Sequence, residues 1–191
     1  MVSIIINTKN EEKNIGRCLK SIKEQIYKDY EVIVVDNSST DETVKIAGSL
    51  GAQVSVFGPE RSEQKNYGAG LAKGDFMLFV DADMELTPGV VGSCVSKANE
   101  GYGVIVIAEE SVGSGFWSKC RTLEKRMYFN DPLIEAPRFF KKEVFQKAGG
   151  YTTGMVSGED WDLRERVKKF GARIGRINDL VYHHEGNLKL T

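Results

Sequence analysis

The sequence predicts an α/β domain with a largely parallel sheet. In the first half of the chain, short β-branched apolar runs alternate with longer segments whose apolar residues recur at helical spacing. Each apolar run is followed by Asn, Asp, Ser or Thr, which are typical of turns and helix caps. This alternation indicates parallel strands joined by crossover helices. The length of 191 residues suits one compact domain.

The first strand is expected at 2–6, where Val and Ile dominate, and the polar residues after it leave the sheet. Asn10 is then a suitable N-cap for a helix, because Glu11 and Glu12 put negative charge at the helix N-terminus. Four apolar residues at helical spacing would form the buried face: Ile15, Leu19, Ile22 and Ile26. The first helix should therefore pack through a single face.

The remaining elements follow from the same signals. Strands are expected at 31–35, 54–57, 76–80, 104–108, 138–140, 174–177 and 180–183. Helices are expected from Asp41, at 61–73, from Thr87 as N-cap with Pro88 in the first helical position, and at 117–128, 142–148 and 160–170. In the helix at 117–128, Trp117, Leu123 and Met127 would face inward. Gly171 would close the last helix.

Composition excludes several classes of protein. Lys and Arg total 26 while Asp and Glu total 27, so the formal charge is -1 and no general positive field exists to hold nucleic acid. No apolar run approaches the ~20 residues that cross a bilayer, and the N-terminus lacks a secretory signal. We therefore expect a cytoplasmic protein, with the cytoplasmic face of a membrane as an alternative place. Cys18, Cys94 and Cys120 are odd in number and widely spaced, which favours reduced thiols.

Polar residues after the predicted strands indicate a binding site. In open α/β sheets, ligands bind beyond the carboxyl ends of the strands. The residues at these ends are Thr8, Asn10, Asp36, Asn37, Asp81 and Asp83. Asp36 is suited to accept a hydrogen bond from a base or a ribose hydroxyl. A turn and helix cap at 36–40 is the alternative explanation of the same residue.

Asp81 and Asp83 flank one small residue directly after an apolar strand. Two carboxylates so close repel each other unless a cation is present, and Mg²⁺ or Mn²⁺ shared with substrate phosphates would remove that cost. A solvated turn is the other interpretation of this short motif. The chain has neither a GxxxxGK[ST] loop nor a GxGxxG motif after the first strand, which disfavours P-loop and dinucleotide-binding proteins.

Three acids lie at 159–162, at the start of a predicted helix and beside Trp161. The helix dipole favours acids there, but three of them beside an indole exceed what capping requires. Asp160 is therefore a candidate general base for an acceptor hydroxyl. His183 and His184 end the last strand and would point to opposite sides of it, so one of them could face the site and bind metal or phosphate. A structural histidine is the alternative.

Together, these motifs resemble the family 2 glycosyltransferases of GT-A fold, which are inverting enzymes that use nucleotide sugars. Residues 2–15 and 30–41 look like the first strand and helix and the nucleotide loop of that family. Asp81 and Asp83 match its DxD metal motif, and 138–171 resembles its acceptor side with the ED motif. The stretch at 7–10 departs from the commoner proline-containing sequence.

The resemblance implies a GT-A type three-layer α/β/α sandwich with a mostly parallel central sheet and a Rossmann-like nucleotide-binding half. One catalytic domain would span 1–191, with a nucleotide-sugar-binding half at about 1–108 and an acceptor-side half at about 109–191. Many relatives are longer, so this domain would belong to a longer protein. The implied nucleotide contacts are Thr8, Asn10, Glu12, Asp36, Asn37, Arg61, Lys65, Asn66 and Asp81. The implied metal ligands are Asp83, Asp81 and His183, and the implied catalytic acids are Asp160 and Glu159.

By the same resemblance, the donor is a UDP- or GDP-sugar, the cofactor is Mn²⁺ or Mg²⁺, and the acceptor is a glycan or a lipid-linked molecule. The metal would offset charge on the departing diphosphate while Asp160 takes the acceptor proton. The segment at 111–135 would be a lid or an acceptor platform. A sugar-phosphate nucleotidyltransferase and a noncatalytic sugar-nucleotide-binding module stay open as alternatives. The loop at 7–12 is acidic rather than basic and glycine-rich, which disfavours a triphosphate site.

Overall fold

The computed structural model describes residues 1–113, 120, 122–123, 127, 135–155 and 157–184. The strands are β1 (Val2–Thr8), β2 (Tyr30–Asp36), β3 (Gln53–Val56), β4 (Phe76–Asp81), β5 (Met84–Leu86), β6 (Val104–Val112), β7 (Pro137–Lys141) and β8 (Ile174–His184). The helices are α1 (Ile15–Lys23), α2 (Thr43–Ser49), α3 (Arg61–Leu71), α4 (Val90–Asn99), α6 (Lys142–Lys147) and α7 (Glu159–Lys169). Helices and strands thus alternate along the first half of the chain, as predicted.

All of these strands belong to one sheet, with the order β3-β2-β1-β4-β7-β6-β8-β5. The first four strands in this order are parallel, as the alternation predicts. The second half of the sheet is mixed, because β7 runs antiparallel to both β4 and β6, while β8 is parallel to β6 and antiparallel to β5. The register pairs Thr8 with Asp36 and Asn7 with Asp81, so the carboxyl ends of β1, β2 and β4 meet at one edge.

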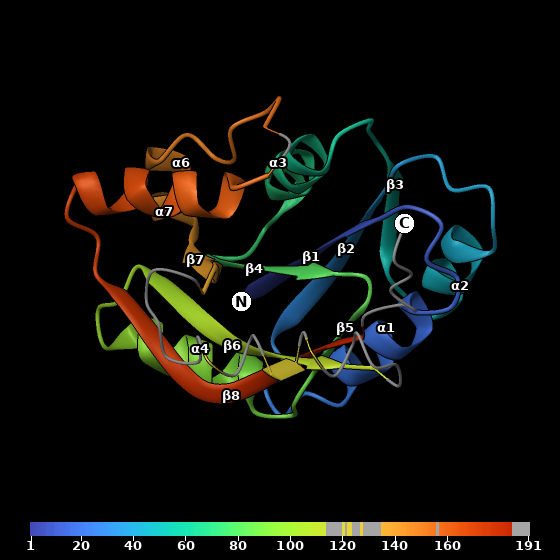
Figure 1. The fold of residues 1–191 in the computed structure, drawn as a ribbon, viewed down its shortest axis with the longest axis horizontal. Coiled ribbons are helices and arrows are strands. Elements are labelled where there is room, and N and C mark those ends of the chain that lie inside the picture. Colours follow the sequence, from blue (N-terminus) through green and yellow to red (C-terminus); the bar gives the residue numbers. More distant parts are fainter. Residues whose placement is uncertain (114–119, 121, 124–126, 128–134, 156, 185–191) are drawn as a thin grey trace.

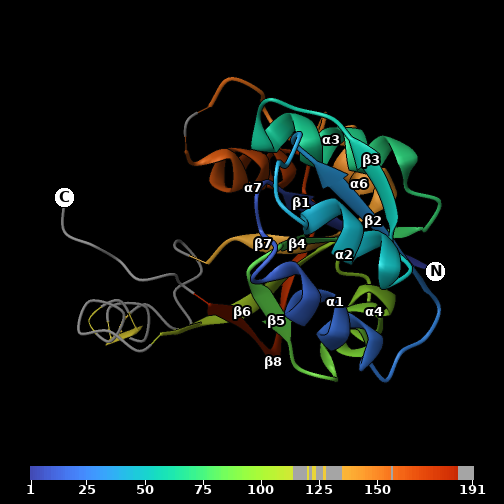
Figure 2. The ribbon, with the colours of Figure 1, turned by 90° about the vertical axis from the view of Figure 1, so that its right-hand side faces the viewer.

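Helices cover both faces of the sheet, which gives three layers (Figures 1 and 2). Alternate residues of β1 point to opposite faces, so Ile4 and Ile6 join one apolar cluster while Ile5 joins the other. The first cluster receives its helical residues from α1, α2 and α4, and the second from α3, α6 and α7. The three-layer α/β/α sandwich expected from the resemblance is therefore confirmed.

The prediction for the start of the first helix was wrong. Asn10 has a positive φ of 53°, and α1 begins only at Ile15. The Asn10 side chain instead accepts a hydrogen bond from the Thr40 amide at 2.9 Å, so a contact with the next loop outweighs the local cap signal. Ile26 is also not part of the buried face, because the helix ends at Lys23 and Ile26 is 76% exposed.

Three further predictions differ from the structure. Thr87 does not cap α4, which follows Gly89; the Thr87 hydroxyl donates to the Leu180 carbonyl at 3.0 Å. The two last predicted strands form the single strand β8. Leu123 and Met127 were expected to face inward but are 63% and 83% exposed. Trp117 lies outside the described residues.

Within the described part of the chain, no helix is both long and apolar enough to cross a bilayer.

Candidate active site

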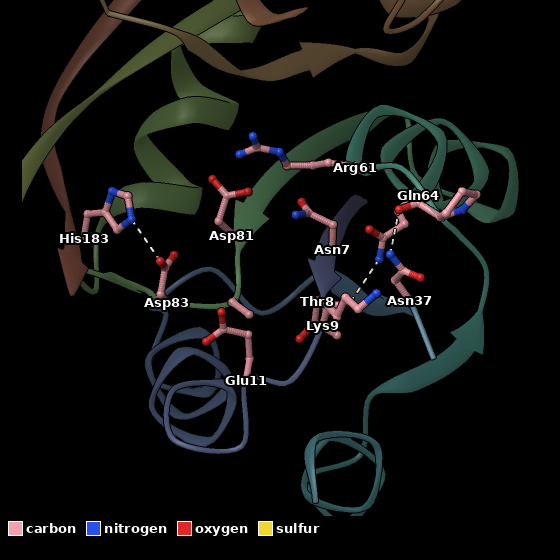
Figure 3. A pocket seen from close by; sticks show the side chains of 12 residues that line it. Asn7, Thr8, Lys9, Glu11, Asn37, Arg61, Gln64, Asp81, Asp83 and His183 are labelled. Atoms are coloured by element: carbon pink, nitrogen blue, oxygen red, sulfur yellow. Dashed lines mark hydrogen bonds and ion pairs between the residues drawn. The ribbon is translucent and has the colours of Figure 1, made fainter. Parts of the chain in front are cut away.

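A cavity of about 330 Å³ opens at the sheet edge where β1 and β4 end (Figure 3). The end of β1 and the loop after it contribute Asn7, Thr8, Lys9 and Glu11 to its lining, and the end of β4 and the turn after it contribute Asp81, Ala82 and Asp83. Asn37, Pro59, Arg61, Gln64 and His183 complete it. This is the position at which open α/β sheets bind ligands.

Several buried oxygens in the cavity have no hydrogen-bond partner within the described part of the chain. They are Oδ1 of Asp81, Oδ1 of Asp83, Oδ1 of Asn7 and Oγ1 of Thr8. Buried polar atoms are nearly always satisfied in folded proteins, so a group of unsatisfied acceptors in one cavity indicates a site built for a ligand or ion.

A buried arginine holds Asp81 in its ionised form. Arg138, from β7, lies 3.2 Å from Oδ2 of Asp81 and also contacts Glu109 through two of its nitrogens. Burial raises the pKa of Asp81, but the positive charges of Arg138 and Lys65 outweigh that effect and lower the pKa to about 2. Burial lowers the pKa of Arg138, and Glu109 and Asp81 more than restore it. Asp81 is therefore a fixed negative charge beneath the cavity.

The two histidines diverge as alternation along a strand predicts. Nε2 of His183 lies 3.0 Å from Oδ2 of Asp83, and His183 lines the cavity (Figure 3). Nε2 of His184 lies 2.7 Å from Oε2 of Glu85, outside the cavity lining. His183 is thus the histidine placed to take part in the site.

The acids of the cavity fit a divalent cation that is shared with phosphates. Asp81 and Asp83 each keep one buried oxygen that has no partner among the described residues, and carboxylate oxygens suit Mg²⁺ and Mn²⁺. Among the described residues, no three His, Cys, Asp or Glu side chains gather into a set that could hold a metal by themselves. A Mg²⁺ ion bound together with substrate phosphates commonly uses only one or two protein carboxylates and retains water.

Glu11 is a cavity residue that sequence reasoning missed. Burial raises its pKa, a hydrogen bond from Asn14 lowers it, and the nearby charges of Asp83, Asp41 and Asp81 raise it further. The net shift is upward. Its position after the first strand was a usable signal, but its acidity was attributed to the helix dipole. A third carboxyl group thus faces the DxD pair.

Helix α3 is fixed against the strand ends by one of its own side chains. Nε2 of Gln64 donates to the carbonyls of Thr8 and Val35, at 3.1 and 2.7 Å. Gly68 allows this close approach, because a Cβ there would lie 2.5 Å from Cγ2 of Ile5. These contacts set Arg61, at the start of α3, over the cavity.

A chain of alternating charges leads from the cavity to two acids at the start of α7. Nε of Arg61 lies 3.7 Å from Oε1 of Glu159, and Nζ of Lys65 lies 3.6 Å from that same oxygen. Lys65 also lies 3.6 Å from Oδ1 of Asp160. The side chain of Lys65 is 2% exposed, and its ammonium stands over the Tyr151 ring at 4.7 Å. Burial raises the pKa of the Tyr151 hydroxyl, and the nearby charge of Asp160 raises it further.

Comparison with known proteins identifies the family. The family model "Glycosyl transferase family 2" matches residues 3–157. The chain belongs to this family. It is also 35% identical, over 98% of its length, to the GalNAc(5)-diNAcBac-PP-undecaprenol beta-1,3-glucosyltransferase of Campylobacter jejuni, of which it spans 58%.

Solved structures show the same fold. The S. aureus TarS fragment 1-349 in complex with UDP-GlcNAc has a TM-score of 0.78 and 23% identity, and the match covers 98% of this chain and 59% of that one. Mannosyltransferase PcManGT from Pyrobaculum calidifontis, in complex with GDP-Man and Mn²⁺, has a TM-score of 0.71 and 22% identity, with 98% and 57% covered. This family 2 chain therefore has the GT-A fold, and it spans less than two thirds of these relatives.

The structure brings only part of the predicted glycosyltransferase site to the cavity. The predicted residues that line it are Thr8, Asn37, Arg61, Asp81, Asp83 and His183. Those outside its lining are Asn10, Glu12, Asp36, Lys65, Asn66, Glu159 and Asp160. Asn7, Lys9, Glu11 and Gln64 line the cavity but were not among the predicted site residues.

The residues outside the lining have contacts of their own. Asp36 accepts hydrogen bonds from both the amide and the hydroxyl of Ser39, as the turn interpretation predicts. Glu12 accepts from the Glu42 amide at 3.2 Å and thereby links two loops. Asn66 exchanges two hydrogen bonds of 2.8 Å with the backbone of Tyr151. Their nucleotide contacts remain predictions.

Proposed function

We propose that this chain transfers a sugar from a UDP- or GDP-sugar to an acceptor hydroxyl or to a lipid phosphate, with inversion and with help from Mn²⁺ or Mg²⁺. Its first half would bind the donor and its second half the acceptor. The observation that carries the proposal is a cavity at the ends of parallel strands, lined by Asp81 and Asp83, each with a buried carboxylate oxygen that no other described residue contacts by a hydrogen bond. The donors named for TarS and PcManGT support it.

In this proposal the cavity holds the diphosphate of the donor. Asp83 and Asp81, with His183 beside them, would hold the cation. The cation supplies positive charge to the diphosphate as the anomeric bond breaks. Arg61 supplies a further positive charge from α3, and Figure 3 shows its guanidinium extending toward Asp81. The side-chain oxygens of Asn7 and Thr8, which have no partner within the part of the chain that the structure describes, would accept hydrogen bonds from the nucleotide or sugar.

Asp160 would accept the proton of the attacking hydroxyl. Its side chain is 25% exposed, so it can reach a second substrate, while Lys65 lies 3.6 Å from one of its oxygens. The acceptor oxygen then bonds to the anomeric carbon, the bond to the diphosphate breaks on the opposite face, and the proton remains on Asp160. A lipid phosphate acceptor is already ionised and would need no such base. The lipid-linked acceptor named for the Campylobacter relative makes that class worth testing.

Product analysis with defined donors tests the proposal. Purified protein with Mn²⁺ is incubated with UDP- and GDP-sugars and with hydroxyl and lipid-phosphate acceptors, and release of nucleoside diphosphate is followed. The expected result is acceptor-dependent release, with an inverted anomeric centre in the product by NMR. Release of pyrophosphate from a nucleoside triphosphate and a sugar phosphate would instead identify a nucleotidyltransferase. Donor binding without turnover on any acceptor would leave only a binding module.

A further inference from the structure

We propose that Glu159 and Lys65 are positioning residues that make Asp160 available only when the donor is bound. The inference rests on the proposed function, because it needs a diphosphate in the cavity. It adds that Glu159 competes with that diphosphate for Arg61, and that Lys65 transmits the outcome to Asp160.

The geometry is a row of four charges that alternate in sign. Arg61 is the end that lines the cavity, and its side chain is 55% exposed, so an incoming anion can reach it. Glu159 is its partner on the protein side, with a side chain only 7% exposed. Lys65 is buried between the carboxylates of Glu159 and Asp160 at the same distance of 3.6 Å from each.

Because Lys65 lies equally far from both carboxylates, a change at Arg61 can alter which of the two Lys65 pairs with more closely. A diphosphate presents several phosphoryl oxygens that can accept charge-assisted hydrogen bonds from the Arg61 guanidinium, so it competes with the single carboxylate of Glu159 for that side chain. Glu159 would then depend mainly on Lys65 for compensation, because a buried carboxylate is costly without a cation. Lys65 would pair more closely with Glu159 and less closely with Asp160. The Asp160 oxygen that Lys65 now contacts is thereby freed to accept the proton of an acceptor hydroxyl.

Competition for Arg61 has a measurable consequence for binding. In Glu159→Gln, Arg61 no longer has a carboxylate partner to leave, so UDP or GDP should bind about two- to five-fold more tightly with Mn²⁺ present, the range that a partly exposed ion pair supplies. At the same time kcat should fall, because the charge that draws Lys65 away from Asp160 is gone. General damage to the site would weaken binding and turnover together.

The test is a double-mutant cycle read by calorimetry with UDP and with GDP. In an Arg61→Met background, Glu159→Gln should leave nucleotide affinity unchanged, because the shared partner is absent. Glu63→Gln is the matched control, since Glu63 lies two residues from Arg61 on α3 and faces a different direction; its affinity should equal that of the wild type. Glu159→Asp, which shortens the side chain and keeps the charge, should tighten binding less than Glu159→Gln.

Three outcomes overturn the inference. Unchanged or weaker nucleotide binding by both Glu159 variants would show that Glu159 does not compete for Arg61. Equal tightening with and without Arg61, or equal tightening by Glu63→Gln, would show a general field effect instead. Absence of UDP and GDP binding by the wild type would remove the proposed function itself, and the inference with it.

Discussion

Replacing Arg138 by Met should destabilise the fold at neutral pH and change how its stability responds to acid. Arg138 is 8% exposed and contacts both Asp81 and Glu109. In the variant, both carboxylates keep their places without the guanidinium between them. Removing one member of a buried charge cluster typically costs about 3–5 kcal/mol, so a loss of this size is expected at pH 7.

The pKa of Asp81 fixes the sign of the acid response. In the wild type, Arg138 and Lys65 overcome the effect of burial and lower that pKa from 3.8 to about 2. The difference corresponds to about 2 kcal/mol of stability, which is present above pH ~4 and is lost as the pH falls toward ~2. Without Arg138, burial and the charge of Glu109 still raise the pKa of Asp81, while fewer positive charges lower it. The folded-state pKa of Asp81 should therefore rise above that of the unfolded chain. As the pH falls, protonation of Asp81 then removes a buried charge that lacks compensation, so the destabilisation of the variant becomes smaller.

Urea unfolding of both proteins in EDTA, from neutral pH down to about pH 4.5, measures this response. The free-energy gap between wild type and Arg138→Met should narrow as the pH falls. In a background of Asp81→Asn, the effect of Arg138→Met should depend less on pH, because one of the two carboxylates cannot titrate. A gap that stays constant or widens in the single variant would refute the reasoning.

Three other substitutions test separate parts of the molecule. Asp160→Asn should reduce kcat by about 10²–10⁴-fold with donor affinity retained; near-normal turnover would favour a phosphate acceptor or another base. Asn66→Ala removes two hydrogen bonds to the Tyr151 backbone, so thermal unfolding should show a loss of about 1–3 kcal/mol of folding stability while nucleotide affinity stays unchanged. A weakened nucleotide affinity would instead support the contact predicted from the resemblance. Gly68→Ala should cost about 1–3 kcal/mol through its clash with Ile5. Gly70→Ala should be neutral or stabilising, because the new Cβ would meet no described residue within 4 Å apart from its own helix backbone and chain neighbours.

The sequence predicts the parallel half of the fold well because its strands are continuous apolar runs. Residues of β1, β2 and β4 are buried on both faces of the sheet, and such runs are visible without knowledge of their neighbours. The three-residue strand Met84–Leu86 was missed, because it is too short to show a period and exists through its pairing with β8. The prediction of Asn10 as a helix N-cap was wrong for a related reason, because its hydrogen-bond partner Thr40 lies in another loop.

The site was predictable where a residue follows a strand and not where it depends on tertiary packing. Asp81 and Asp83 were found from their place after β4. Arg138 was not, because its partners Asp81 and Glu109 lie 57 and 29 residues away, and an arginine in a short apolar strand carries no local signal. The nucleotide contact of Lys65 rests on the resemblance and stays a prediction, whereas its position between the carboxylates of Glu159 and Asp160 could not be foreseen, because those partners lie on a helix distant in sequence.

Calorimetry on the second DxD carboxylate tests the central claim most directly. UDP and GDP are titrated into the wild type and into Asp83→Asn, each with Mn²⁺ and with EDTA. If Asp83 helps to hold a cation that the diphosphate shares, the wild type should bind the nucleotide far more tightly with Mn²⁺, and Asp83→Asn should lose most of that difference. For either nucleotide, equal affinity of both proteins with Mn²⁺ and with EDTA would contradict the account.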